Sequence, residues 1–321
     1  MGKRRVISFS PTVKRLPQLA LYWAAIADRL GPDYPSTRCL LGWGAKRSSR
    51  WPRAMGLPCV ALEEGFLRSL KLAPSAPLLS LVFDELGIYY DARRPSRLES
   101  LIVAAQDSTG ECARAEALRA AWVAGRVTKY NHAREPNEEP QPRNHVLVID
   151  QTWGDLSISG GLASAGSFTR MLEAALDEHP GRPVVVKIHP QVLAGRKRGY
   201  LTALPRHGES RIRVVGEDLH LPFFLEHAHA VYTVTSQVGF EALLWNKTVR
   251  VFGMPFYAGW GLTQDDLPSP SRRQKRSLTM LVHAALIDYP VYIDQGRGCI
   301  SSAEDTLARV VGYRRREGLL V

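Results

Sequence analysis

The chain has few cysteines and no long apolar run. Its four cysteines, spread over 321 residues, form no CxxC pair. We therefore expect neither a disulfide framework nor a zinc site, but small buried thiols in a reducing compartment. The longest apolar stretches, near Leu19–Ile26 and Leu78–Phe83, are far shorter than the ~18 residues that cross a bilayer. Lys14 and Arg15 interrupt the region after the basic start, which argues against a signal peptide and favours a soluble, cytoplasmic protein.

Common nucleotide and catalytic motifs are also absent. The sequence contains no GxGxxG, no GxxxxGK[ST], no GxSxG and no HExxH. It therefore gives no sign of a dinucleotide-binding fold, a P-loop, a nucleophile elbow or a zinc-binding helix. It also lacks Asp-x-Asp, the usual hint of a metal-bound sugar nucleotide. We therefore expect no metal or other cofactor, and positive groups or helix ends would have to neutralise a leaving phosphate.

Positive charge is present in excess. Lys and Arg number 42 against 31 Asp and Glu, which gives a formal net charge of +11. This excess suits nucleic acid, an anionic membrane surface or anionic small molecules. No zinc finger or RNP sequence is present, so nucleic acid is not expected as a partner. The basic clusters, expected to be solvated surface, are Lys46–Arg53, Arg196–Arg198, Arg272–Arg276 and Arg314–Arg316.

A polar, proline-rich stretch divides the chain. Residues 135–142 hold three prolines, three acids and no apolar residue, which is typical of a linker or exposed loop. We place the linker over residues 136–143, between an N-terminal unit of residues 1–135 and a C-terminal unit of residues 144–321. The last helix begins near Ser301-Ser302 and ends at Arg314–Arg316. We expect it to pack back on the N-terminal unit.

Strand-like and helix-like segments alternate on both sides of the linker. The expected strands are Arg5–Ser8, Cys39–Gly42, Cys59–Leu62, His145–Ile149, Pro183–Ile188, Ile212–Val215, Ala230–Thr235 and Val249–Phe252. The expected helices are Leu19–Leu30, Arg97–Ala105, Cys112–Ala124, Ser167–Glu178, Pro222–His227 and Gln237–Trp245. This order predicts an α/β fold of two Rossmann-like, doubly wound units. They face a central crevice, where ligands bind at the carboxyl ends of the strands.

Polar residues follow two of the expected strands. Asp150 ends the strand His145–Ile149, where an Asp often accepts only backbone N–H bonds. Asp155 lies further into the loop beside Gly154, which lets the backbone approach a ligand. Position alone leaves a functional and a structural role for Asp155 equally open. Lys187 and His189 end the next strand and would reach the same crevice.

Two more groups carry candidate chemistry. Thr235 or Ser236 is expected to cap the following helix, either structurally or with a phosphate bound at the helix end. Glu63 and Glu64 precede Arg68 at another strand end. Adjacent carboxylates repel, and burial would raise the pKa of one, which suits a general acid or base. The alternative for the two acids is an ordinary first turn of a helix.

Several longer motifs carry a family resemblance. They are Gly42-Trp43-Gly44, Leu62–Ser69, Leu79–Val82, Gly87–Ala92, Asp150-Gln151-Thr152 with Asp155 and Ser157, Val186–Pro190, Thr235–Gln237 with Gly239–Leu243, and Phe256–Thr263. Through them, from about Gly42 to Tyr313, the chain resembles the KpsC family of capsular polysaccharide biosynthesis proteins, specifically one β-Kdo glycosyltransferase module. Family members usually carry two such modules in tandem, and their acid pair usually reads Glu-Asp.

The resemblance implies a GT-B-like, retaining glycosyltransferase that takes Kdo from CMP-Kdo and builds the poly-Kdo linker on a (lyso)phosphatidylglycerol acceptor. The Asp150-Gln151-Thr152 signature resembles the first module and implies a 2,4-linkage. The N-terminal unit would take the acceptor and the C-terminal unit the CMP-sugar. The resemblance further implies a peripheral enzyme at the cytoplasmic face of the inner membrane, with other capsule assembly proteins as partners.

Residue roles also follow from the resemblance. Asp155 would be the nucleophile that forms a Kdo–enzyme adduct, and one of Glu63 and Glu64 the base, with Glu63 preferred by analogy. His189 would contact the CMP phosphate with support from Ser236. The further substrate-binding candidates on these motifs are Lys187, Thr235, Gln237, Arg68, Gln151 and Glu241.

Two other functions stay open. The paired-acid and His-Pro motifs alone also suit a transferase for CMP-sialic acid or another CMP-nonulosonate. A non-catalytic capsule export or glycolipid-binding protein is the second alternative, and it predicts that Asp155 is dispensable and that binding depends mainly on salt.

Overall fold

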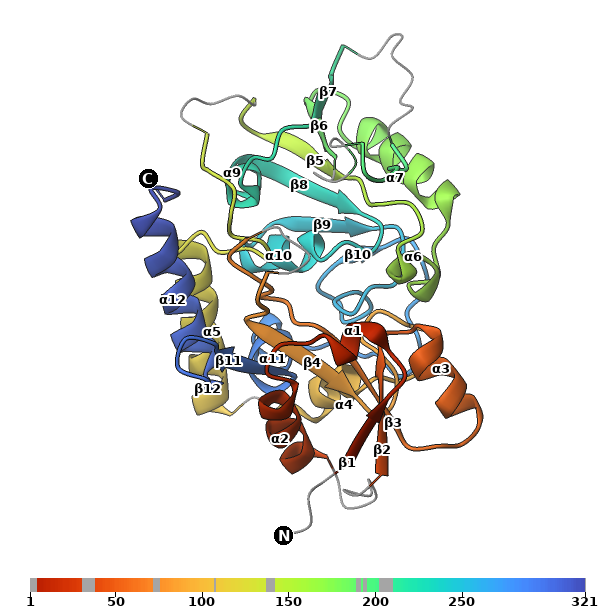
Figure 1. Ribbon diagram of the computed structural model, residues 1–321. Coiled ribbons are helices and arrows are strands. Elements are labelled where there is room, and N and C mark those ends of the chain that lie inside the picture. The colour runs from red at the N-terminus through yellow and green to blue at the C-terminus, as the bar shows by residue number, and fades with distance from the viewer. Residues whose placement is uncertain are drawn as a thin grey trace.

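Two six-stranded sheets form the centres of two units, one above the other in Figure 1. The computed structural model describes residues 5–30, 38–71, 76–106, 108–136, 142–188, 192, 195–201 and 210–320. The first sheet contains, in spatial order, β1 (Arg5–Ser8), β2 (Arg38–Trp43), β3 (Cys59–Glu64), β4 (Ser80–Asp84), β11 (Pro290–Asp294) and β12 (Cys299–Ser301). The second contains β10 (Gln264–Asp265), β9 (Thr248–Val251), β8 (Ala228–Thr233), β5 (His145–Ile149), β6 (Val184–Lys187) and β7 (Ile212–Val215).

The second sheet is parallel throughout and covered on both faces. Side chains alternate along its strands, so Val146 and Val148 of β5 pack with α7 (Ala165–Asp177), while Leu147 and Ile149 belong to the cluster that contains α9 (Leu221–His227) and α10 (Val238–Leu244). A parallel sheet buried on both faces favours continuous runs of β-branched residues. That is why these strands could be recognised from the sequence. The short helix α6 (Leu156–Gly160) follows β5.

The first sheet is mixed. Strands β1, β2 and β3 are parallel, whereas β4, β11 and β12 pair antiparallel. No crossover helix lies among the described residues between β3 and β4, and a parallel pair normally needs such a crossover. The helices around this sheet are α1 (Pro11–Lys14), α2 (Leu19–Arg29), α3 (Arg47–Ala54), α4 (Arg97–Ala104), α5 (Thr109–Ala124), α11 (Leu278–Val282), the π-helix η1 (His283–Asp288) and α12 (Ala303–Arg316).

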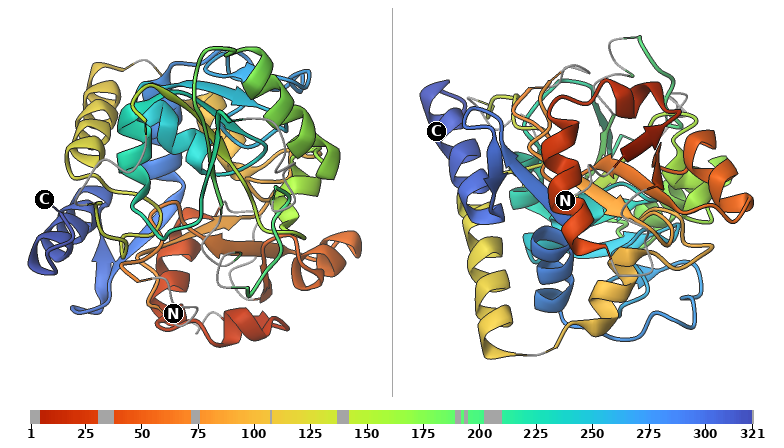
Figure 2. Two further views of the ribbon diagram at one scale, coloured as in Figure 1. Left: turned by 90° about the horizontal axis from the view of Figure 1, so that it is seen from above. Right: turned by 60° about the horizontal axis from the view of Figure 1, so that its bottom comes forward.

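The C-terminal part of the chain returns to the first unit. The sequence suggested this only for the last helix, but β11 and β12 also join the first sheet, and α11, η1 and α12 contact α5 (Figures 1 and 2). Helix α12 begins as expected, since the Ser302 side chain accepts a hydrogen bond from the Asp305 amide at 3.0 Å. One hydrophobic cluster consequently runs through both units. In it Phe66 stacks on Phe256 with ring centroids 4.5 Å apart.

The α/β fold of two units is confirmed, and every expected strand and helix is present with small shifts at its ends. Cys39 and Cys59 are buried as expected, but the same expectation is wrong for Cys299, which is exposed on the edge strand β12. Within the described parts of the chain, no helix is long and apolar enough to cross a bilayer.

Candidate active site

A cavity of about 600 Å³ lies between the two units. The carboxyl ends of β3, β5, β6 and β8 all reach it. Its lining includes Lys46, Glu63, Glu64, Arg68, Tyr89 and Tyr90, then Thr128, Lys129, Tyr130 and His132, and from the second unit residues 150–157, Lys187, Thr235, Ser236, Gln237 and Glu241. Every candidate residue that the structure describes therefore lines one cavity. His189 lies outside the described residues.

Glu63 and Glu64 end β3 and have different surroundings. The Tyr90 hydroxyl lies 3.5 Å from Glu63 Oε2, and the Glu64 amide donates to Glu63 Oε1 at 3.1 Å. Burial, and then the neighbouring charge of Glu64, raise the pKa of Glu63 to about 7. Glu64 instead forms an ion pair with Arg68, with 2.7 Å between Oε2 and Nε. With a pKa near 7, the Glu63 carboxyl is able to exchange a proton near neutral pH.

Asp155 is exposed at the first turn of α6. It is the N-cap residue of that helix, and its Oδ1 accepts a hydrogen bond from the Ser157 amide at 2.9 Å. Gly154, with a positive φ of 79°, precedes it. Among the described residues, only Oδ1 of this carboxylate has a protein donor. Oδ2 can therefore contact a ligand while Oδ1 keeps the hydrogen bond that caps α6.

Asp150 and Gln151 have structural partners. Asp150 accepts backbone hydrogen bonds from Tyr200 and Leu201 at 3.0 and 3.1 Å, which is the structural role expected for it, although the donors lie in a distant loop. The Gln151 side chain accepts from the Thr235 amide at 2.9 Å and donates to the Thr235 hydroxyl at 3.0 Å. Gln151 and Thr235 thus join the loops after β5 and β8.

Helix α10 begins one or two residues later than expected from the sequence. The N-cap residue is Gln237 rather than Thr235 or Ser236, and the Thr235 side chain is bound to Gln151 instead. The Ser236 hydroxyl still accepts a hydrogen bond from the Val238 amide at 3.3 Å. Gln237 donates to the Phe66 carbonyl at 2.8 Å and so connects the two units.

Lys187 places a buried amine at the end of β6. Its Nζ has no hydrogen-bond partner among the described residues and lies 4.9 Å from the centroid of the Phe224 ring. Burial lowers the pKa of Lys187 to about 8. An unpartnered amine that lines a cavity is suited to bind an anionic ligand.

Segment 126–136 carries site residues that the sequence analysis missed. Thr128 donates to Glu241, whose pKa is raised to about 7 by burial, and the Lys129 amide donates to the same carboxylate at 3.3 Å. Burial lowers the pKa of the Lys129 side chain, but Tyr130 and the carboxylates of the cavity outweigh this and raise it. The segment forms neither a helix nor a regular strand, so periodicity offered no signal for it.

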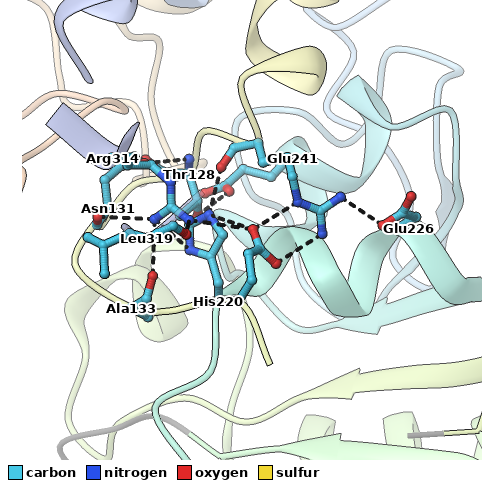
Figure 3. Close-up of polar contacts among 10 residues, drawn as sticks. Thr128, Asn131, Ala133, His220, Glu226, Glu241, Arg314 and Leu319 are labelled. Carbon is cyan, nitrogen blue, oxygen red and sulfur yellow. Dashed lines mark hydrogen bonds and ion pairs between the residues drawn. The ribbon is translucent and has the colours of Figure 1, made fainter. Parts of the chain in front are cut away.

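A buried arginine on the last helix holds this segment in place (Figure 3). Arg314 Nη1 donates to the carbonyls of Asn131 and Ala133, both at 3.1 Å, and Nη2 donates to the Leu319 carbonyl at 2.8 Å. His220 Nε2 lies 2.6 Å from the Arg126 carbonyl, and its Nδ1 lies 3.4 Å from Arg314. Burial, and then the charge of Arg314, keep the pKa of His220 well below its usual range. The neutral ring therefore donates to the carbonyl and accepts from the guanidinium.

Across the described ranges, no three His, Cys, Asp or Glu side chains lie close enough together to hold a metal ion. The polar side chains of the cavity are instead mixed carboxylates, amines, amides and hydroxyls. This set is able to transfer protons and to bind anions.

The sequence matches the family described as "Capsule polysaccharide biosynthesis protein" over residues 38–137 and 112–300. The chain is 40% identical over 305 residues to the capsule polysaccharide modification protein LipA of Neisseria meningitidis serogroup A. The aligned region covers 90% of this chain and 43% of LipA. It is 35% identical over 294 residues to the lipopolysaccharide-processing protein LpsZ of Rhizobium meliloti, covering 90% of this chain and 62% of LpsZ. The chain thus spans less than half the length of LipA.

Two solved structures share the fold. One is Thermosulfurimonas dismutans KpsC, beta Kdo 2,4 transferase, with a TM-score of 0.87 and 38% identity over 97% of this chain and 99% of that one. The other is the beta Kdo 2,7 transferase of the same protein, with a TM-score of 0.65 and 28% identity over 91% and 88%. The fold is accordingly the GT-B-like arrangement of two units. By sequence and by structure, the chain belongs to the capsule polysaccharide biosynthesis protein family.

Proposed function

We propose that the chain is a glycosyltransferase that transfers Kdo, a 2-ketosugar acid, from CMP-Kdo during capsule synthesis. The observation that carries this proposal is the end-to-end match with the Kdo 2,4 transferase of T. dismutans. The weaker likeness to the 2,7 transferase favours a 2,4-linkage. Because LipA is more than twice as long as this chain, the proposal covers one transfer step rather than the activity of a whole LipA-like protein.

The site supports a double displacement with retention. The Asp155 carboxylate attacks C2 of the sugar, the C2–O bond to CMP breaks, and CMP leaves with the electron pair. An acceptor hydroxyl then attacks C2 of the Kdo–Asp155 adduct, Glu63 takes the hydroxyl proton, and the Asp155 carboxylate is released. Two inversions at one carbon give net retention.

The charges of the cavity suit this donor. CMP-Kdo carries a phosphate and a sugar carboxylate, and both need cationic partners in a partly buried site. The amines of Lys187 and Lys129 reach the cavity from opposite units. We assign Lys187 to the CMP side, since it lies on β6 close to the loops after β5 and β8. His189, two residues further on, would contact the CMP phosphate.

The acceptor is proposed to be a (lyso)phosphatidylglycerol that already carries Kdo, used by a peripheral enzyme at the inner membrane. The supporting observations are the capsule relatives and the basic net charge of +11. A non-catalytic glycolipid-binding protein would not need an exposed carboxylate and a proton-exchanging one in the same cavity.

Release of CMP from two donors tests the proposed function. Purified chain is incubated with CMP-Kdo or CMP-sialic acid, each with a Kdo-terminated phosphatidylglycerol acceptor, and CMP is quantified by chromatography. We expect acceptor-dependent CMP release from CMP-Kdo only. CMP release from CMP-sialic acid alone would show that the donor is CMP-sialic acid rather than CMP-Kdo. CMP release from neither donor would contradict the proposal that the chain is a transferase.

A further inference from the structure

Two segments with exposed side chains, one from each unit, line the cavity and are called its lips here. The lower lip is α3, whose N-cap residue Lys46 lines the cavity. The upper lip is the segment 153–162 that includes α6, and its residues Trp153 and Leu156 also line the cavity. Helices α3 and α6 lie on the same side of the molecule in Figures 1 and 2.

The lower lip exposes large apolar and basic side chains together. Arg47, Trp51 and Met55 follow each other at four-residue spacing and so share one face of the helix. Trp51 is 65% exposed and Met55 is 72% exposed. The Arg47 guanidinium lies 5.8 Å from the centroid of the Trp51 ring, and Arg50 is exposed beside it. Residues 38–62 contain no acid that would offset these charges.

The upper lip repeats this composition. Trp153 is 54% exposed, and Leu156 and Leu162 are exposed near it. The loop 195–201 adds the exposed side chains of Arg196, Lys197 and Arg198, and the Arg198 guanidinium lies 5.4 Å from the centroid of the Trp153 ring. The Trp153 amide donates to the Arg198 carbonyl at 2.7 Å, which fixes this loop against the lip.

We propose that the two lips form a membrane-binding face that rests on a bilayer containing anionic phospholipid. Exposed Trp and aliphatic side chains enter the headgroup region, while Lys and Arg bind the phosphates around them. Each lip offers both kinds of side chain. The lips and the loop 195–201 carry six exposed cations, namely Lys46, Arg47, Arg50, Arg196, Lys197 and Arg198. The inference rests on the proposed function, since a lipid-linked acceptor has to enter the cavity from a bilayer.

Vesicle cosedimentation of the full chain tests the proposal without requiring catalysis. Vesicles of phosphatidylcholine alone are compared with vesicles that also contain phosphatidylglycerol. The variants are R47E/R50E in the lower lip and R196E/R198E in the upper lip. The control is R315E/R316E, which makes the same change in net charge at the exposed end of α12, on the opposite side of the molecule (Figure 1).

The native chain is expected to bind only the anionic vesicles. Because one Lys or Arg near an anionic surface contributes about fivefold in binding, each lip variant should lose at least about twentyfold, and the control much less. W51A/M55A should also weaken binding, whereas I300A, an exposed apolar change on β12, should not. Equal losses for lip and control charge variants would overturn the proposal.

Two further results separate this inference from the proposed function. Absence of vesicle binding in a chain that still transfers Kdo to a detergent-dispersed acceptor would overturn the membrane face alone. Vesicle binding in a chain that releases no CMP from CMP-Kdo would overturn the transferase alone. A change in oligomeric state of W51A/M55A, with unchanged vesicle binding, would identify the lips as a protein interface and also overturn the proposal.

Discussion

Arg68 and Glu64 form an ion pair, with Arg68 Nε 2.7 Å from Glu64 Oε2. The neighbouring Glu63 faces the cavity beside Tyr90 and has a pKa of about 7, raised by burial and by the charge of Glu64. Two acids that are adjacent in sequence thereby have different surroundings. Glu64 is paired with Arg68, whereas Glu63 has a pKa at which a carboxyl is able to exchange a proton near neutral pH.

Glu63→Gln should lower the turnover of sugar transfer by about a hundredfold to ten-thousandfold, the usual contribution of a general base. The affinity for CMP-Kdo should change little, because Gln has the same shape. Glu64→Gln should have a smaller effect. Steady-state kinetics of both variants provide the check, and equal, mild losses would count against Glu63.

The pKa of Glu63 also predicts a pH profile. A base must be deprotonated to accept a proton, so turnover should fall about tenfold per pH unit below about pH 7. Glu241 has a similar raised pKa, because it is buried against Thr128. The Glu241→Gln variant is therefore the control. It should keep the acidic limb of the profile, and loss of that limb would assign the titration to Glu241.

Lys187→Met should weaken donor binding but stabilise the fold. The pKa of Lys187 falls from 10.5 to about 8 on folding. Near neutral pH the amine is therefore protonated in a site that disfavours its charge, which lowers the free energy of unfolding. Removing the amine should raise the free energy of unfolding at pH 7 by up to about 3 kcal/mol. The gain should shrink as the pH rises from about 8 to 10.5. Urea unfolding at several pH values measures this, and a pH-independent difference would contradict it.

Arg314→Met should destabilise the protein strongly. The change leaves Asn131, Ala133 and Leu319 carbonyls without their donor and the buried Glu135 without one of its cations. We expect a loss of about 3–5 kcal/mol in the free energy of unfolding. Arg315→Met, at an exposed neighbour, should change it by less than about 0.5 kcal/mol. Similar values for both variants would show that the buried network contributes little.

The sequence predicted the second unit better than the first. Strands such as His145–Ile149 are buried on both faces, so their composition alone identifies them. The strand Pro290–Asp294 begins with proline and lies between β12 and β4 in the first sheet, and β4 is far away in the sequence. Helix α3 was taken for a basic surface cluster. Arg53 within it is partly buried and donates to the Gly87 carbonyl at 2.8 Å.

The site was predictable where its residues follow strands. Asp155, Lys187 and Thr235 lie at or after the ends of parallel strands of the second sheet, which brings them to one edge. Glu63 ends β3 of the first sheet. Lys129 was not predictable in this way. It lies in an irregular segment that tertiary contacts with Arg314 and Glu241 hold in place, and no local pattern encodes those contacts.

We expect Asp155 to form a covalent adduct with the sugar. Intact-protein mass spectrometry after mixing with fresh CMP-Kdo, without acceptor, tests it most directly. The Glu63→Gln variant is included because loss of the base should let the adduct accumulate. Asp155→Asn is the matched control, since Asn caps a helix about as well as Asp and should preserve α6.

We predict a mass increase of one Kdo on the native chain and on Glu63→Gln, mapped to the peptide with Asp155 and absent from Asp155→Asn. An Asp155→Asn variant that still forms the adduct, or that transfers Kdo at the native rate, would contradict it.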